Sequence, residues 1–393
     1  MRWLHLPSSQ PALAPVRRRH LGFALLFTLS ISSRALLLTV TPLRALQILG
    51  SEELVGLAYV VGSLGSLLLT LTLPALYARL PRERVYLLGV LLAAAGPLLI
   101  SLNEVPFLLV GLAAQLAAVA LLEITLNLYV LDHVERKHLS RFEPMRLALS
   151  AAAWTAGPWL GIKLSGVVPN LPFYVSAGVC VVMATTFLVM RPTVKGRAVK
   201  ASAIANVGLF LKQPRLRLAW VLAFSRSTWW VLFFVYGQIY FVEGLGFDEE
   251  TASLLSSLVM AATFLIPLWG WIGRRVGMRR LLWTGYGLSA ATTLLLAAVG
   301  DPAWLAATLL VICGVVTSVI DGAGNVPYLR AVKPSQRSRM TAVFMTYRDA
   351  SQLIPPAIFS GLLALFPFSA LFVATGLLMG GMTLLVRHIP RRM

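Results

Sequence analysis

Six charged residues interrupt long apolar stretches of this 393-residue chain and are its strongest chemical signal. They are Arg34, Glu123, Arg226, Asp321, Arg348 and Asp349. Each charge would cost about 2.5 to 3.5 kcal/mol at the centre of a bilayer, even on a lenient insertion scale. Such groups must pair, face water or change protonation. Ionisable residues of this kind are typical of solute or proton pathways.

The apolar stretches around these charges are long enough to cross a membrane. Hydrophobic residues make up 58% of the chain and charged residues only 12%, and a bilayer core needs roughly 20 apolar residues as helix. Twelve membrane helices are predicted, near residues 21–45, 54–77, 85–101, 105–131, 145–165, 171–190, 218–242, 252–273, 281–300, 303–329, 339–365 and 368–387. The sequence therefore predicts an all-α membrane protein and excludes an ordinary water-soluble enzyme.

The basic residues that give the net charge of +19 lie in short clusters between the predicted helices and do not form a continuous patch. Of the 34 Lys and Arg residues, 29 fall before, between or after the predicted helices on one side of the membrane. The positive-inside rule then places both termini in the cytoplasm, and the predicted location is the cytoplasmic (inner) membrane. Because most of the excess charge reports topology, a nucleic-acid partner is not expected.

The chain also repeats itself. Residues 123–158 align without gaps on residues 321–356, at an offset of 198, and Ser33-Arg34 matches Ser225-Arg226. We therefore predict two pseudo-symmetric six-helix bundles with a basic cytoplasmic linker between them. The predicted boundaries are 1–190 for the first bundle, 191–217 for the linker and 218–393 for the second bundle, with a short amphipathic element near 207–211.

A basic turn follows the second predicted helix and another follows the eighth. They read Pro74, Leu76, Arg79, Pro81, Arg82 and Arg84 in the first half, and Gly270, Ile272, Arg275, Gly277, Arg279 and Arg280 in the second. With twelve helices in two repeats, the whole chain resembles the major facilitator superfamily of secondary transporters, whose turn pattern is approximately GxLADRxGRR. The aspartate of that pattern falls on Ala78 and on Arg274 here. Gly157-Pro158 also resembles the start of the GPxxG motif of the family's antiporter branches.

The resemblance implies that predicted helices one, four, seven and ten line a central cavity. Arg34, Glu123, Arg226 and Asp321 lie one on each of these helices, so opposite charges are arranged with two-fold symmetry. In one interpretation, Arg34 with Glu123 and Arg226 with Asp321 are buried ion pairs that fix helix packing within each half. In the other, the arginines bind an anionic or polar substrate while the carboxylates exchange protons.

Further polar groups share faces with these charges. Asn127 and Asn325 each follow an acid by one helical turn and could bind the substrate or the carboxylate. Trp230 follows Arg226 by one turn, and ordinary packing is the alternative role for this tryptophan. Asp349 points about 100° away from its neighbour Arg348, as helical periodicity requires.

Several Gly, Pro and Arg residues are candidates for gating or conformational change. These are Gly157, Pro158, Gly270, Arg275, Gly277, Pro355 and Pro356. The two adjacent prolines are predicted to kink the helix at 339–365, because proline removes a backbone hydrogen bond. Tight helix packing is the alternative explanation, since membrane helices are rich in Gly and Pro.

The sequence thus predicts a secondary transporter that moves a small organic solute by alternating access, with protons as the expected coupling ion. An organic-anion transporter and an exporter of amphipathic compounds remain alternatives, as does a non-transporting scaffold or receptor-like relative. No enzyme activity, metal or cofactor is predicted, because no nucleophile set, His/Cys ligand cluster or phosphate loop is present. The expected partners are substrate, protons and lipid, and the expected state is a monomer.

Overall fold

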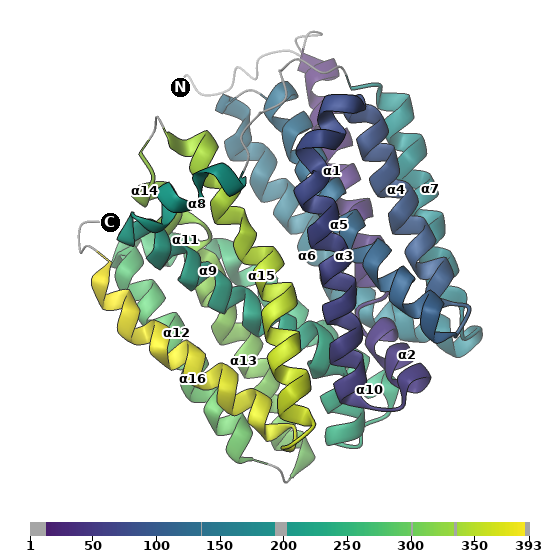
Figure 1. Ribbon diagram of the computed structural model, residues 1–393, viewed down its shortest axis with the longest axis vertical. Coiled ribbons are helices and arrows are strands. Elements are labelled where there is room, and N and C mark those ends of the chain that lie inside the picture. The colour runs from purple at the N-terminus through teal and green to yellow at the C-terminus, as the bar shows by residue number, and fades with distance from the viewer. Residues whose placement is uncertain (1–12, 135, 193–202, 300–301, 334–335, 390–393) are drawn as a thin grey trace, which may run out of the picture.

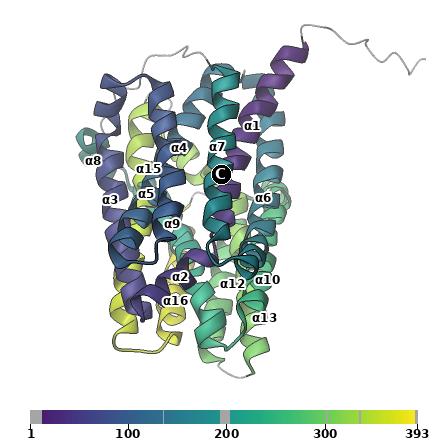
Figure 2. The same cartoon turned by 90° about the vertical axis from the view of Figure 1, so that its right-hand side faces the viewer.

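Two bundles of long helices lie side by side in the computed structural model (Figure 1), which describes residues 13–134, 136–192, 203–299, 302–333 and 336–389. The first bundle contains α1 (Leu13–Ala35), α2 (Val40–Leu49), α3 (Glu52–Arg79), α4 (Arg82–Ile100), α5 (Val105–His133), α6 (Arg136–Val167) and α7 (Leu171–Met190). The helices run nearly parallel to one long axis, as a view turned by 90° shows (Figure 2). The predicted all-α class is confirmed.

The second bundle repeats this plan with more interruptions. It contains α9 (Pro214–Val231), η1 (Leu232–Gly237), η2 (Tyr240–Gly244), α10 (Glu249–Ala261), η3 (Ala262–Leu265), α11 (Ile266–Val276), α12 (Met278–Ala298), α13 (Ala303–Ala323), α14 (Val326–Ala331), α15 (Arg337–Leu363), α16 (Ser369–Leu385) and η5 (Val386–His388). The short α8 (Ala203–Leu211) precedes it and packs against α15. Each of the twelve predicted membrane helices coincides with a helix or with consecutive helical segments.

Ten of the described helical segments are long and apolar enough to cross a membrane by themselves. The two remaining long helices are α6 and α15. Both are long enough to cross a bilayer at 1.5 Å per residue, but α6 begins with a cluster of basic residues and α15 carries Arg348, Asp349 and two prolines. These residues lower the mean hydropathy of α6 and α15, although both helices pack within the bundles as the other spans do.

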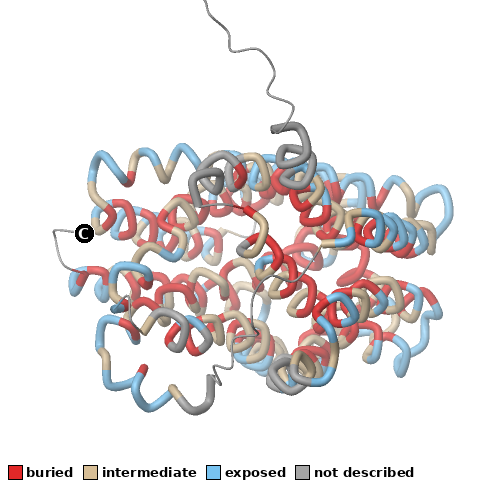
Figure 3. Tube along the Cα trace, turned by 90° about the horizontal axis from the view of Figure 1, so that it is seen from above, coloured by how far each residue is buried: buried red, intermediate tan, exposed pale blue. Residues whose placement is uncertain are grey.

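Apolar side chains cover the outside of the molecule as well as its interior. Buried residues lie toward the inside of each bundle and exposed residues around the rim (Figure 3). Leu68, Leu91, Val181 and Val189 are 63–77% exposed on helices α3, α4 and α7. A water-soluble protein rarely exposes so much contiguous apolar surface, so this surface is suited to lipid.

Four of the predicted spans are interrupted, and the eighth span passes from α10 through the 3-10 turn η3 into α11. The first span stops at Ala35 and resumes as α2 at Val40, and the tenth is divided at Gly324, whose φ of +50° favours glycine. The seventh span passes from α-helix into the π-helical turns η1 and η2. Such turns are rare and occur frequently at functional sites.

The two bundles contact each other through α3 against α15 and α6 against α10. The lower end in Figure 1, where α2 lies, is called the distal end because it is opposite the start of α1. Two hydrogen bonds join the bundles through the start of α3 and the segment just before α2. Ser360 Oγ donates to Glu53 O at 2.7 Å, and the buried Thr39 Oγ1 donates to Gln238 Oε1 at 2.9 Å. These contacts close the distal end.

An ion pair adds to this closure where α10 begins. Lys163 Nζ at the end of α6 lies 2.5 Å from Glu250 Oε1. Asp248 caps the start of α10. Its carboxylate accepts hydrogen bonds from the hydroxyl of Thr251 at 2.7 Å and from the backbone N–H of the same residue at 3.0 Å. These bonds hold the pKa of the Asp248 carboxyl below its usual range.

Helix α15 runs without interruption through Pro355 and Pro356. Because proline has no N–H, the carbonyl of Gln352, one turn before Pro356, has no partner within the helix. Ser63 Oγ of α3 donates to this oxygen at 2.8 Å. The two prolines therefore leave a backbone carbonyl of α15 free to accept a hydrogen bond from the other bundle. The helix itself stays continuous.

Replacing Ser63 with Ala should lower the free energy of unfolding by about 1–3 kcal/mol, because the partly buried Gln352 carbonyl would lose its donor. Thermal unfolding of the purified protein in detergent measures this. Thr72→Ala on the same helix is the matched control, since the exposed Thr72 hydroxyl bonds only to Leu69 O of its own helix. Equal effects of the two substitutions would contradict a contact between bundles.

Candidate functional site

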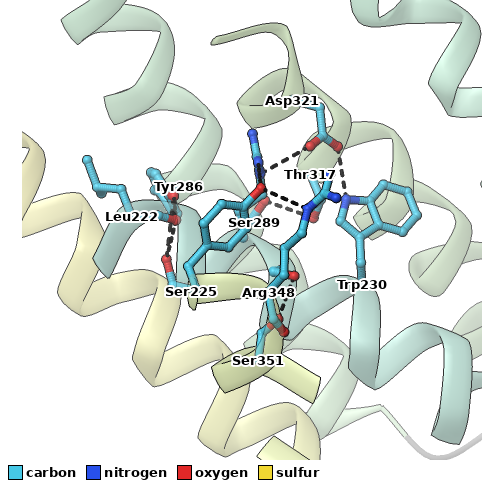
Figure 4. A network of polar contacts seen from close by, with 12 residues as sticks. Leu222, Ser225, Trp230, Tyr286, Ser289, Thr317, Asp321, Arg348 and Ser351 are labelled. Carbon is cyan, nitrogen blue, oxygen red and sulfur yellow. Dashed lines mark hydrogen bonds and ion pairs between the residues drawn. The ribbon is translucent and has the colours of Figure 1, made fainter. Parts of the chain in front are cut away.

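Asp321 of α13 is held by two donors from α9. Its Oδ1 lies 3.4 Å from Arg226 Nε, and its Oδ2 accepts a hydrogen bond from Trp230 Nε1 at 2.9 Å (Figure 4). Arg226 and Trp230 are one helical turn apart, so both side chains face α13. The side chains of the ion pair are only 13% and 17% exposed. The structure therefore joins these three predicted residues into one buried cluster.

Glu123 has a different partner from the one predicted. Its Oε2 lies 2.5 Å from Nη1 of Arg348 on α15, whereas no ion pair between Arg34 and Glu123 is present within 4 Å. The guanidinium of Arg34 lies instead over the ring of Trp154, 5.3 Å from its centre. The interpretation that pairs Arg34 with Glu123 is therefore wrong, because an arginine of the other half is the ion-pair partner of Glu123, whereas Arg226 does pair with Asp321.

Tyr347 connects the two ion pairs. This tyrosine is 3% exposed, and its hydroxyl accepts hydrogen bonds from Arg348 Nε at 3.4 Å and from Arg226 Nη2 at 3.5 Å. The contacts run in the order Glu123, Arg348, Tyr347, Arg226, Asp321 and Trp230, and we call these six residues the charge network. The network starts in the first bundle and ends in the second.

Neutral side chains next to the charge network form further hydrogen bonds. Ser351 Oγ donates to the Arg348 carbonyl at 2.8 Å, one turn along α15. Thr317, one turn before Asp321 on α13, shares a 3.1 Å hydrogen bond with Ser289 of α12 (Figure 4). The first bond lies within α15, and the second joins α13 to α12.

A cavity of about 210 Å³ lies beside the network, between the two bundles. Its lining includes Arg34, Thr41, Tyr59, Gln115, Trp154, Trp230, Phe234 and Gln352. Arg34 is the one charged residue among the described residues that line it. Ligand sites are typically apolar cavities with a few polar groups, so this arrangement is suited to a small solute with one anionic group.

A protein-family model of the major facilitator superfamily matches the chain over residues 23–355, with a second match over 218–392. The chain belongs to this superfamily. It is therefore an integral membrane transporter and not an enzyme. No curated protein sequence matches the chain, so the family relationship depends on the family model and the fold.

Solved structures of superfamily transporters share the fold at low sequence identity. The nucleoside transporter NupG is 14% identical, with a TM-score of 0.75 over 94% of this chain and 98% of that one. An inward-facing, occupied bacterial homologue of the lysosomal transporter Spinster has the same identity and TM-score over 97% of each chain. The fucose:proton symporter FucP of E. coli is 14% identical, with a TM-score of 0.65 over 95% and 99%.

Three predicted site residues lie apart from the ion pairs of this superfamily member. Asn127 and Asn325 are exposed, and their side chains form no hydrogen bond with a described residue. Asn325 lies at the break between α13 and α14. Asp349 is partly buried and has no ion pair with a described residue, although it follows Arg348 directly. Their roles in substrate or proton binding stay predictions.

The GPxxG-like motif of the superfamily lies at the crossing of α6 and α1. A Cβ atom added at Gly157 would meet the backbone of Ala35, and one added at Gly161 would meet the carbonyl of Leu36. Pro158 is buried in the same crossing. These contacts fall where α1 ends, so the motif allows two helix backbones to touch beside Arg34.

The superfamily turn in the second half is a closely packed, positively charged corner. Gly277, between α11 and α12, has a φ of +93°, a conformation that favours glycine. Gly270 lies against Gly322 of α13. The exposed Arg275 lies over the ring of Trp271 at 3.9 Å. The gating role of these residues stays a prediction.

The corresponding turn in the first half contains an ion pair that the sequence did not suggest. Arg82 Nη1 at the start of α4 lies 2.6 Å from Asp132 Oδ2 at the end of α5. The superfamily's aspartate is replaced by Ala78, and Asp132 supplies a carboxylate from another helix. The sequence did not suggest three residues that the structure brings into contact with the site or the turn. Two of them, Tyr347 and Gln115, carry no charge, and the third, Asp132, lies outside the turn motif.

The described residues contain no group of three or more His, Cys, Asp and Glu side chains that could hold a metal ion. Four of the intramembrane charges form two linked ion pairs, and Arg34 lines the cavity.

Proposed function

We propose that the protein moves a small organic anion together with protons across the cytoplasmic membrane by alternating access. The bundles of residues 1–190 and 218–393 would rock about the cavity, with the linker 191–217 and both termini in the cytoplasm. The closed distal end supports a state in which the cavity is reached from the side of the termini. The proton-coupled relative FucP and the basic loops also support this proposal.

The ion pair between Glu123 and Arg348 is the observation that carries the proposal. It joins α5 of one bundle to α15 of the other, so rocking of the bundles must strain or break it. A proton on Glu123 would remove the attraction and release Arg348. Protonation of one carboxylate would then favour the change between the two access states.

Arg34 provides the connection between substrate and proton. It lines the cavity and is close enough to Glu123 to interact with its charge. An anion bound to Arg34 would lower the positive potential at Glu123 and so favour its protonation. Substrate and proton would therefore bind to the same state of the transporter.

Export of amphipathic compounds is the second candidate, because Trp154, Trp230 and Phe234 give the cavity an aromatic wall. This function would need no anion at Arg34. A scaffold without transport is disfavoured by the cost of keeping ionised groups in the membrane interior. Screening organic anions against amphipathic cations distinguishes the two transport functions.

Glu123→Gln should abolish proton movement driven by an organic anion, at least 10-fold below the unsubstituted protein, because the amide cannot ionise. The measurement is a pH-sensitive dye inside liposomes that contain the purified protein. Glu104→Gln is the matched control, since Glu104 is exposed just before the same helix. Unchanged coupling in both Glu123→Gln and Asp321→Asn would contradict the proposal, and a lack of movement with any solute would favour a scaffold.

A further inference from the structure

We infer that the cavity binds a single-ring aromatic carboxylate that carries a second polar group at the end of the ring far from the carboxylate. This inference rests on the proposed function only for the claim that the bound molecule is also transported. It follows from four features of the cavity: one cation without a carboxylate partner, a stacked aromatic wall, two unpaired polar atoms and a small volume.

Arg34 is the feature that selects a carboxylate. Glu123 is occupied by Arg348, and Arg34 has no ion pair with a described residue. The guanidinium stays beside the Trp154 ring, where its donors can still turn toward the cavity. An arginine presents a planar fork of N–H donors that matches a carboxylate with two parallel hydrogen bonds. One anionic group is therefore expected at this end of the cavity.

The aromatic wall selects a flat ring. Trp154 of the first bundle and Phe234 of the second are stacked, with centroids 5.5 Å apart and planes 16° apart. Phe234 is stacked in turn on Trp230, at 5.8 Å and 29°. All three side chains line the cavity. Offset-stacked or edge-to-face contact with such a wall favours an aromatic ring over a saturated ring of similar size.

Two buried polar atoms of the lining have no partner. They are Oγ1 of Thr41 and Nε2 of Gln115. Buried polar atoms are nearly always hydrogen-bonded in native proteins. Both residues lie toward the distal end: Gln115 is eight residues before Glu123 on α5, which is about 12 Å of helix. Neither atom is exposed to the cavity as the side chains lie, so a hydroxyl or similar group on the end of the ring opposite Arg34 reaches them when the Thr41 and Gln115 side chains turn toward the cavity that they line.

The volume limits the size of the ligand. At about 210 Å³, the cavity is smaller than the roughly 300 Å³ at which pockets for drug-sized ligands begin. A single ring with short substituents fits this space.

Binding to the unsubstituted protein in lipid nanodiscs at pH 7.5, measured by isothermal titration, tests the ligand class. The probes are 4-hydroxybenzoate, benzoate, cyclohexanecarboxylate and neutral 4-hydroxybenzamide. We expect 4-hydroxybenzoate to bind at least 10-fold more tightly than benzoate, and benzoate at least 5-fold more tightly than cyclohexanecarboxylate. The neutral amide should not bind measurably. Equal binding of benzoate and cyclohexanecarboxylate, or binding of the amide as tight as that of 4-hydroxybenzoate, would overturn the inference.

Single substitutions assign each part of the ligand to its residue. Gln115→Leu should remove most of the preference for 4-hydroxybenzoate over benzoate and leave benzoate binding within 2-fold. Trp154→Leu should remove the preference for benzoate over cyclohexanecarboxylate. Arg34→Gln should weaken all carboxylates at least 100-fold. The matched controls are Trp283→Leu, on the 47% exposed surface of α12, and Arg280→Gln, also exposed. Equal loss for both members of a probe pair would indicate a structural role and overturn the assignment.

The same preparation separates this inference from the proposed function. If 4-hydroxybenzoate binds but moves no protons in liposomes, the ligand class stands and proton-coupled transport fails. If a non-aromatic anion moves protons while none of the aromatic acids binds, transport stands and the ligand class fails.

Discussion

Asp321→Leu should lower the free energy of unfolding by about 3–5 kcal/mol, the cost of leaving a buried charge without its partner. The substitution leaves Arg226 uncompensated at a site where the two side chains are only 13% and 17% exposed. It also removes the acceptor of the Trp230 indole N–H. Thermal unfolding in detergent, followed by the fraction of protein that remains monodisperse, measures the loss.

Adding Arg226→Met to Asp321→Leu should recover most of this stability, because an apolar pair of similar volume often replaces a buried ion pair without loss. Transport should stay at background in both variants. This pair of results would show that the charges are retained for function and not for packing. Recovery of transport in the double variant would contradict that conclusion, and so would wild-type stability of Asp321→Leu alone.

Gly161→Val should prevent the first bundle from forming its native packing. Any Cβ at this position meets the carbonyl of Leu36, and valine adds two further carbons. Overpacking costs about 1–3 kcal/mol where side chains can adjust. Here the obstacle is backbone, so we expect more than about 3 kcal/mol and little folded protein. The measurement is the yield of monodisperse protein after extraction and its melting temperature.

Gly178→Val is the matched control for this substitution. Gly178 also lies within a membrane helix, α7, but a Cβ there has no atom within 4 Å. It should therefore fold with nearly the original yield. A normal yield and melting temperature for Gly161→Val would mean that α1 and α6 can separate without cost, and would remove the steric argument for the motif.

Hydropathy was sufficient to predict the twelve spans because a bilayer imposes both the length and the internal hydrogen bonding of each crossing. It could not predict the break between Ala35 and Val40 or the π-helical turns after Val231. These interruptions remain apolar, so neither composition nor loop charge marks them. They depend on how neighbouring helices pack, which is tertiary information.

The candidate site was only partly predictable for a related reason. The intramembrane charges identified Arg226 with Asp321, since both belong to the same half. The internal repeat relates corresponding residues of the two halves and says nothing of contacts between the halves. It could not predict that Arg348 of the second bundle pairs with Glu123 of the first. Gln115 and Thr41 carry no charge, and only the enclosed geometry shows that their polar atoms lack partners.

The pairing of Glu123 with Arg348 also has a consequence for biosynthesis. Glu123 leaves the ribosome 225 residues before Arg348. At about 5–20 residues per second, that interval is about 10–45 s, during which the first bundle contains the acid without its final partner. Arg34 is the cation already present beside it. Insertion of α15 is therefore the step that supplies Glu123 with its ion-pair partner.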